Sequence, residues 1–252
     1  MKLLRNMKYY KADMHLHTAL SPCGSLDMGP QNLVRHAVEA GLDMIAVTDH
    51  NSGRQCRSVA RVASDQGLSV LCGVEVNTRE EVHCLAYFPS FRELDAFDRL
   101  LYGQLADIPN DPDKFGYQVV VDEQEQIVDY PQKLLISSVD MGVDEVEQAV
   151  HRLGGLFIPA HSDRLRNGII AQLGFIPPGL KCDALEISRH SNVETLVREH
   201  PYLADYSFLR GSDAHHPEDI GRGGTRFQLA DLTWREICMA LEGTGERKME
   251  LL

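Results

Sequence analysis

Histidines and acidic residues recur directly after short apolar runs in this chain, and this regularity constrains the fold more than any other feature. His15 and His17 close the first run, His50 follows the second, and His161 follows a later one. In parallel α/β folds, ligands bind at the carboxyl ends of the strands. The pattern therefore predicts one site, assembled from residues that lie far apart in the sequence.

Seven apolar runs with strand character alternate with helical patterns. The runs are 8–17, 44–48, 68–76, 82–88, 156–160, 184–187 and 207–211. This alternation predicts an α/β fold with a mainly parallel sheet, open or closed into a barrel. The stretch from about 90 to 150 is less regular and contains a predicted hairpin, 117–121 with 127–130, so we expect an insertion or cap there. We predict a single domain over 1–252.

Eight imidazole and carboxylate groups are candidates for binding metal ions. Residues i and i+2 of a strand face the same way, so His15 and His17 can reach one ion. One ion cannot use eight ligands, whereas two or three ions that share carboxylates can, and this donor set suits zinc, manganese or iron(II). A lone buried histidine is more often a hydrogen-bonded core residue, which is how we interpret His36, His151 and His200. The candidates are His15, His17, His50, Glu75, His83, His161, Asp213 and His215.

Together these motifs resemble the PHP (polymerase and histidinol phosphatase) family of metal-dependent phosphoesterases. The resemblance spans about residues 9–240 and implies a distorted (β/α)7 barrel with a trinuclear metal centre, in which the eight candidates are the ligands. It also implies hydrolysis of a phosphoester by a metal-bridging hydroxide. The motifs that carry it are His15-Leu16-His17-Thr18, Thr48-Asp49-His50, His161 and Ser212-Asp213-Ala214-His215, with Glu75 and His83 between them.

The chain departs from the family pattern shortly after the first motif. Many members of the family have an acidic or imidazole ligand there, and we expect Asp27 to supply a carboxylate after a short loop. Cys23 is the alternative, since a thiolate at this position would favour zinc; it is equally interpretable as an ordinary packed thiol. We assign Asp49 a supporting catalytic role, in which it orients a histidine.

Three arginines are candidates for binding the substrate phosphate. Arg164 follows His161, and Arg189 and Arg222 follow later strand ends. A guanidinium matches phosphate oxygens in a two-point contact, although the same residues are also typical of ordinary surface positions. His216 and His190 neighbour the site in sequence, and either could protonate the leaving oxygen.

Net charge bears on the substrate and the partners. With 25 basic and 37 acidic residues, the chain carries −12 at pH 7. Such a surface repels long nucleic acids and anionic membranes, so we expect a small phosphorylated metabolite or a short nucleotide as substrate, and no long nucleic acid. The alternatives are an exonuclease or oligonucleotide phosphodiesterase and a metal-binding module without turnover; the lysine pattern disfavours an amide hydrolase.

Compartment and assembly are less constrained by the sequence. The six cysteines form no CxxC pair, and most lie in apolar runs, which is typical of a reduced cytoplasmic protein. The sequence contains no run of about 18 apolar residues, which a membrane span would require. The sequence leaves the oligomeric state open.

Overall fold

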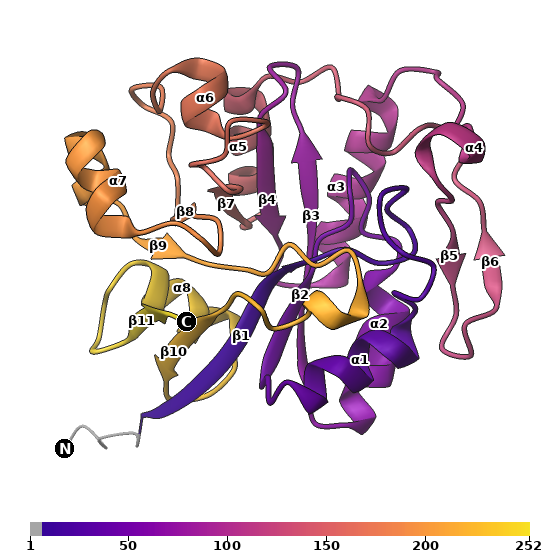
Figure 1. Cartoon of the computed structure of the whole chain (residues 1–252), viewed down its shortest axis with the longest axis horizontal. Helices are drawn as coiled ribbons and strands as arrows, with labels where there is room; N and C mark the ends of the chain where they lie inside the picture. The colour runs from indigo at the N-terminus through magenta and orange to yellow at the C-terminus, as the bar shows by residue number, and fades with distance from the viewer. Residues whose placement is uncertain (1–6) are drawn as a thin grey trace.

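A curled sheet of seven strands forms the centre of the computed structural model, which describes residues 7–252 (Figure 1). The first six residues of the predicted 1–252 domain lie outside the described part. The architecture confirms the predicted α/β class and the distorted barrel. In spatial order, the strands are β11 (Lys248–Leu251), β10 (Thr225–Leu229), β1 (Lys8–Leu16), β2 (Met44–Val47), β3 (Ser69–Asn77), β4 (His83–Tyr87) and β7 (Leu156–Pro159).

The sheet is mixed, whereas the sequence pattern predicts a mainly parallel one. Strands β1, β2 and β3 run parallel, but β4 pairs antiparallel with β3 and β7 pairs antiparallel with β4. The physical reason lies in the link between β3 and β4, which spans only 78–82. A link of this length closes a hairpin, whereas a parallel pair needs a crossover of a dozen or more residues.

Two short strand pairs lie outside this sheet. Strands β8 (Leu185–Glu186) and β9 (Phe208–Leu209) pair in parallel, and β5 (Val120–Val121) pairs antiparallel with β6 (Ile127–Asp129). The β5–β6 pair confirms the predicted hairpin. All three residues of β6 are exposed to solvent.

The helices follow the amphipathic patterns of the sequence. In α1, for example, Pro30 occupies the first turn, and Leu33, Val34 and Ala37 are buried along one face. None of the helices described between residues 7 and 252 combines the length and the apolar character that a membrane crossing requires. The helices are α1 (Pro30–Glu39), α2 (Cys56–Asp65), α3 (Phe91–Gln104), α4 (Pro112–Phe115), α5 (Val143–Arg152), α6 (Ile169–Leu173), α7 (Val193–Glu199) and α8 (Trp234–Leu241), with 3-10 turns η1 (Pro201–Asp205) and η2 (Pro217–Asp219).

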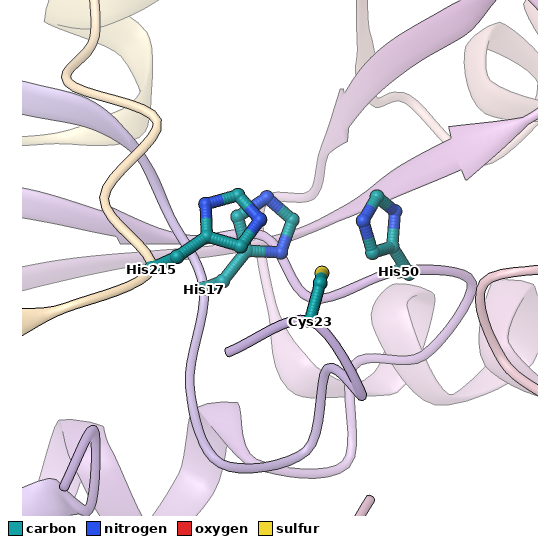
Figure 2. Close-up of side chains that lie close together, drawn as sticks. All are labelled: His17, Cys23, His50 and His215. Atoms are coloured by element: carbon teal, nitrogen blue, oxygen red, sulfur yellow. The ribbon is translucent and has the colours of Figure 1, made fainter. Parts of the chain in front are cut away.

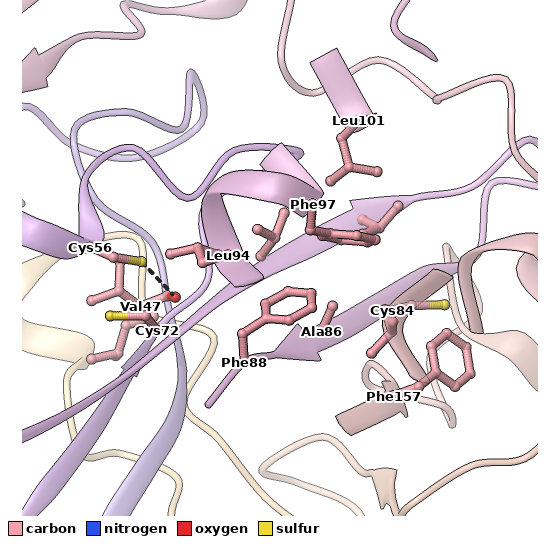
Figure 3. Close-up of a cluster of buried hydrophobic side chains, with 14 of the residues drawn as sticks. Val47, Cys56, Cys72, Cys84, Ala86, Phe88, Leu94, Phe97, Leu101 and Phe157 are labelled. Atoms are coloured by element: carbon pink, nitrogen blue, oxygen red, sulfur yellow. Dashed lines mark hydrogen bonds between the residues drawn. The ribbon is translucent and has the colours of Figure 1, made fainter. Parts of the chain in front are cut away.

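The two faces of the sheet bury separate apolar clusters, because alternate strand residues point to opposite sides. Cys84 and Ala86 of β4 join the cluster that includes Phe97 of α3 (Figure 3). Leu85 and Tyr87 join the other cluster, which α8 covers. With both faces buried, the strands are held firmly, and this fixes the positions of the residues at their ends.

The predicted insertion at 90–150 divides into parts with different environments. Helices α3 and α5, which bound it, contribute buried residues to the main apolar cluster. Between them, the segment that carries β5 and β6 stands at the side of the sheet (Figure 1). Val119 of this segment packs against Ala19 in the loop after β1 and donates a backbone hydrogen bond to its carbonyl. The segment therefore borders the loop that follows the first histidine motif.

Candidate metal centre

Five strands and the loop after β9 bring the site residues to one edge of the sheet. His50 follows β2 and bridges to Glu75 in the parallel strand β3. Because β4 runs antiparallel to β3, its first residue, His83, pairs with the end of β3 and reaches the same edge. His161 follows β7, whose end pairs with the start of β4. The loop after β9 returns beside the end of β1, where Ala214 bridges to Leu16 and brings its neighbours on both sides to the site.

Eight of the nine predicted ligands lie in one connected cluster. The described residues contain three groups, within each of which the potential ligand atoms lie within 4.8 Å of one another; His17 belongs to two of the groups and His50 to two. His161 joins through Glu75, with 3.1 Å between Nε2 and Oε1. The groups are His15, His17 and Asp213; His50, Glu75 and His83; and His17, Cys23, His50 and His215.

Glu75 lies at the middle of this cluster and is 1% exposed. Its two carboxylate oxygens lie 2.9–3.4 Å from ring nitrogens of five histidines: His15, His17, His50, His83 and His161. The Nε2 atoms of His15 and His17 are only 3.2 Å apart, and each lies within 3.4 Å of Asp213 Oδ1. So many donor atoms facing one another around shared carboxylates are typical of a site for bridged ions.

Charge and burial oppose each other in the cluster. Burial lowers the pKa of His17, but its hydrogen bonds to Asp213 and Glu75 outweigh this effect and raise the pKa to about 9. Burial raises the pKa of Glu75, but the charges of His83 and His15 hold it well below its ordinary value. Burial, together with the charge of His17, lowers the pKa of His215 to about 4. The protonation of the imidazoles and of the carboxylates in the cluster is therefore coupled.

The buried polar atoms fit divalent ions. His50 Nδ1 and His161 Nδ1 are buried and have no hydrogen-bond partner among the described residues. A buried polar atom without a partner is costly unless a ligand satisfies it. Imidazoles mixed with carboxylates are the donor set of zinc, manganese and iron(II) sites.

Glu186 supports the cluster from behind, and the sequence analysis missed this role. Its carboxylate accepts from His15 Nδ1 at 2.9 Å and from the backbone N–H of His161 at 2.8 Å. A partner on Nδ1 fixes the ring so that Nε2 faces the centre. The signal was available, since Glu186 lies in a predicted strand, 184–187, like Glu75 in its own strand.

Asp49 contacts the histidines indirectly, through a hydroxyl group. Its carboxylate accepts from the hydroxyls of Thr18 and Ser21 at 2.7 Å each. The Ser21 hydroxyl lies 2.9 Å from His17 Nδ1. Asp49 is therefore placed to orient His17 through Ser21, without touching a histidine ring itself.

The backbone of the site is unusual at two of these residues and at a glycine. His161 and Asp213 have φ angles of 28° and 54°, in the left-handed region that residues with side chains seldom adopt. Such conformations persist where the surrounding structure imposes them, and they concentrate at functional sites. At Gly211, an added Cβ would lie 2.5 Å from His15 Cβ and 2.8 Å from Glu186 Oε1, so only glycine lets this loop pass beside His15.

Asp27 requires a correction. We preferred it to Cys23 as the ligand after the first motif, but the structure places it on the surface, where it lines a separate cavity of about 710 Å³ with Asn32 and Glu125. The reason is the tight turn at 18–24, which closes early and points Cys23 toward the histidines. Figure 2 shows the Cys23 sulfur beside the rings of His17, His50 and His215.

The other predicted site residues lie on the rim. Arg164 Nη1 donates to Asp213 Oδ2 at 2.6 Å. Arg189 and Arg222 both pair with Asp219, at 3.5 and 2.9 Å. His216 and His190 are exposed, and neither belongs to the three groups of the cluster. His190 Nε2 lies 3.1 Å from Arg189 Nε.

Comparison with known proteins shows where this site belongs. The PHP domain model matches residues 13–173, and a PHP-associated model matches 205–243. The uncharacterized protein YqxK of Bacillus subtilis is 21% identical over 274 residues, which covers 96% of this chain and 64% of that protein.

Solved structures share the fold at low identity. The lesion-specific endonuclease Q of Pyrococcus furiosus superposes with a TM-score of 0.74 at 19% identity, over 96% of this chain and 58% of its own. A two-domain protein of Bacteroides vulgatus that contains a predicted PHP-like metal-dependent phosphoesterase superposes with a TM-score of 0.60 at 16% identity, over 98% of this chain and 65% of its own. The chain thus spans about three fifths of the length of these relatives.

One comparison overturns an expectation. An endonuclease Q complex with a 27-mer duplex, which carries an abasic lesion at the active site, superposes with a TM-score of 0.73 at 19% identity, over 96% of this chain and 58% of its own. Excluding long nucleic acid in favour of a small substrate was therefore wrong, because a net charge of −12 says nothing about the local field at the site. The PHP model matches more than half of the chain, and the described site holds the metal-binding residue types of its motifs: this chain belongs to the PHP domain family.

Proposed function

We propose that this protein hydrolyses phosphodiester bonds in a nucleic-acid strand, and that two or three divalent ions occupy its centre. The observation that carries the proposal is the set of three donor groups linked through His17 and His50, with Arg164 hydrogen-bonded to Asp213 of one group. A single ion would not need such a set, whereas adjacent ions suit displacement at phosphorus.

The proposed ligands are the eight clustered residues of the prediction: His15, His17, His50, Glu75, His83, His161, Asp213 and His215. Manganese, iron(II) and zinc are the candidate ions. Divalent ions held there supply Lewis-acid activation of water and neutralise phosphate charge. The protein's own part is to hold the ring nitrogens at fixed positions, which Glu186 does for His15 and Ser21 does for His17.

The arginines on the rim would bind the phosphate oxygens. Arg164 is tied to Asp213 and lies next to the proposed ions, so its guanidinium suits the phosphate that reacts. Arg189 and Arg222 share Asp219, which leaves guanidinium donors for neighbouring phosphates. The side chains of Arg164 and Arg222 are 42% and 56% exposed, and a strand can reach them without an opening step.

The similarity to endonuclease Q favours a strand over a free metabolite. That protein is seen with a duplex at its active site, and this chain matches it over 96% of its own length. The match covers 58% of that protein, so we do not carry over its lesion specificity. We propose instead that the segment between α3 and α5, which borders the loop after β1, selects the substrate of this chain.

The test compares end-labelled oligonucleotides with a phosphomonoester. The full chain, loaded with manganese or zinc, is incubated with single-stranded DNA, duplex DNA, an abasic duplex and p-nitrophenyl phosphate. We expect cleavage within the oligonucleotides, lost in Asp213→Asn and kept in Glu236→Gln, which alters a buried glutamate of α8. Binding by three arginines predicts a slope of log affinity against log salt of about −2.7 for duplex DNA, reduced by about one in Arg189→Gln.

The possible outcomes distinguish an error in the proposed substrate from an error in the proposed metal centre. Hydrolysis of the monoester alone, lost in Asp213→Asn, would refute the nucleic-acid substrate and leave the metal centre standing. Metal binding without any turnover would favour the module without catalysis. Failure to bind manganese or zinc at all would refute the centre itself.

A further inference from the structure

Cys23 gives this centre a donor that the imidazole and carboxylate set does not explain. We propose that Cys23 binds one of the ions as a thiolate, beside His50 and His215, and that this position therefore takes zinc in preference to manganese. The inference rests on the proposed metal centre and adds to it a thiolate ligand and an ion preference.

The geometry brings the sulfur into the cluster. Cys23 Sγ and one ring nitrogen each of His17, His50 and His215 all lie within 4.8 Å of one another. In Figure 2, these side chains come from three separate chain segments and gather around one space. One thiolate with imidazoles at this separation matches the ligands of zinc sites, which are typically tetrahedral.

The histidines have their lone pairs available for an ion. His215 Nδ1 lies 2.9 Å from the carbonyl of Asp213, so Nδ1 donates and Nε2 is left as the acceptor that an ion requires. His17 Nδ1 is engaged by Ser21 in the same way. His50 gives a second, independent indication of a ligand: its side chain is 4% exposed, and its Nδ1 makes no hydrogen bond, although it lies 3.2 Å from Glu75 Oε2.

The loop that carries Cys23 is fixed rather than free to swing. Ser21 N–H donates to the Thr18 carbonyl, Gly24 N–H donates to the Ser21 carbonyl at 2.8 Å, and Ser25 N–H donates to the His215 carbonyl at 2.8 Å. At Gly24, an added Cβ would lie 2.5 Å from the Thr18 carbonyl oxygen. These contacts hold the sulfur of Cys23 against the loop that carries His215.

The other cysteines have different environments. Cys56, Cys72 and Cys84 are buried in the main apolar cluster (Figure 3). Cys182 and Cys238 are partly exposed, and neither belongs to a group of potential ligands among the described residues. Cys23 is exposed at the rim, and Cys238 serves as its matched control.

The chemistry of the thiolate determines the ion. Binding replaces the S–H bond of Cys23 with a sulfur–zinc bond and releases one proton to solvent. Thiolate is a soft ligand that favours zinc, whereas manganese prefers oxygen ligands. A centre with one thiolate ligand should therefore bind zinc in preference to manganese more strongly than a centre built from imidazole and carboxylate alone.

The experiment uses Co²⁺ as a spectroscopic probe of the reduced full chain. We expect a sulfur-to-cobalt charge-transfer band in the near ultraviolet, lost in Cys23→Ser and kept in Cys238→Ser. X-ray absorption of the zinc-loaded protein should show a sulfur scatterer at about 2.3 Å beside nitrogen and oxygen at about 2.0–2.1 Å. If Cys23→Ser fails to fold, Cys23→Asp should still bind metal, with a reduced preference for zinc over manganese.

Each result bears on a different conclusion. Cobalt bound without the band, or a band unchanged in Cys23→Ser, would overturn the thiolate ligand and leave the metal centre intact. The same zinc preference in Cys23→Asp and in the wild type would overturn the proposed selectivity. No bound cobalt or zinc in the wild type would refute both this inference and the proposed function.

Discussion

Replacing Glu186 by glutamine tests whether this residue positions the metal ligands. The carboxylate is 2% exposed and accepts from both His15 Nδ1 and the His161 N–H. Both hydrogen bonds end on Oε2, while Oε1 lies 3.1 Å from His15 Nδ1. In Glu186→Gln, an amide oxygen at the Oε2 position can accept from both donors, but the NH₂ group then faces the N–H of His15 Nδ1. The variant therefore loses the negative charge behind His15 and buries an NH₂ donor without a partner.

The magnitude follows from those contacts. Removing a hydrogen-bond partner from a metal-binding histidine typically weakens metal affinity by about 10–100-fold, which corresponds to about 1.4–2.7 kcal/mol. A buried donor without a partner also lowers the free energy of unfolding of the metal-free protein by about 1–3 kcal/mol. We expect both effects in Glu186→Gln.

The assay measures zinc affinity by competition with a chelator, and stability by urea unfolding of the metal-free protein. Glu236→Gln is the matched control, because Glu236 is 4% exposed and accepts from Ala230 N–H at 2.8 Å, far from the site in α8. It should lose stability but keep its zinc affinity. Unchanged affinity in Glu186→Gln, or an equal loss in both variants, would refute the positioning role.

Further predictions concern metal removal, a glycine and a histidine. Zinc at 100 times its dissociation constant adds about 2.7 kcal/mol of stability, so a chelator should lower the Tm by about 5–10 °C in calorimetry; an unchanged Tm would contradict the centre. Gly211→Ala places a Cβ 2.5 Å from His15 Cβ and should cost about 1–3 kcal/mol in unfolding free energy, whereas Gly103→Ala in α3, where the Cβ meets nothing within 4 Å, should be neutral or stabilising. The hydrogen bond to Asp183 raises the pKa of His151 above its ordinary 6.5. The stability from this pair is thus fully present below about pH 6.5 and is lost as pH rises through the raised pKa, so His151→Gln should destabilise more at pH 6 than at pH 9 in urea titrations.

The strand ends show how far sequence patterns reach. Apolar runs that end in histidine or acid located most residues of the cluster, because each strand holds the residues at its end at a sheet edge whatever the neighbouring strands do. The same pattern marked Glu186, which we did not use as a site residue. The sense of β4 was not readable in this way, yet it is the antiparallel turn that brings His83 to the edge.

The loop after the first motif shows where sequence reasoning stopped. Asp27 and Cys23 were both within reach of a short loop, and a carboxylate was the more familiar ligand. The turn at 18–24 is fixed by backbone hydrogen bonds and by the hydroxyl of Ser21, which Asp49 holds. The contact between Ser21 and Asp49 joins residues 28 positions apart, so local preference alone could not decide which side chain faces the centre.

By itself, the sequence determined the α/β class, the strand-end donors and the chemistry they share, because these depend on local periodicity and residue type. The tertiary structure decided which donors meet, which residue supports each ring, and how Arg189 and Arg222 come to share Asp219. Those outcomes depend on distances between segments that are remote in the chain. They are set by the curl of the sheet and the sense of its strands, and neither is encoded in a single stretch of sequence.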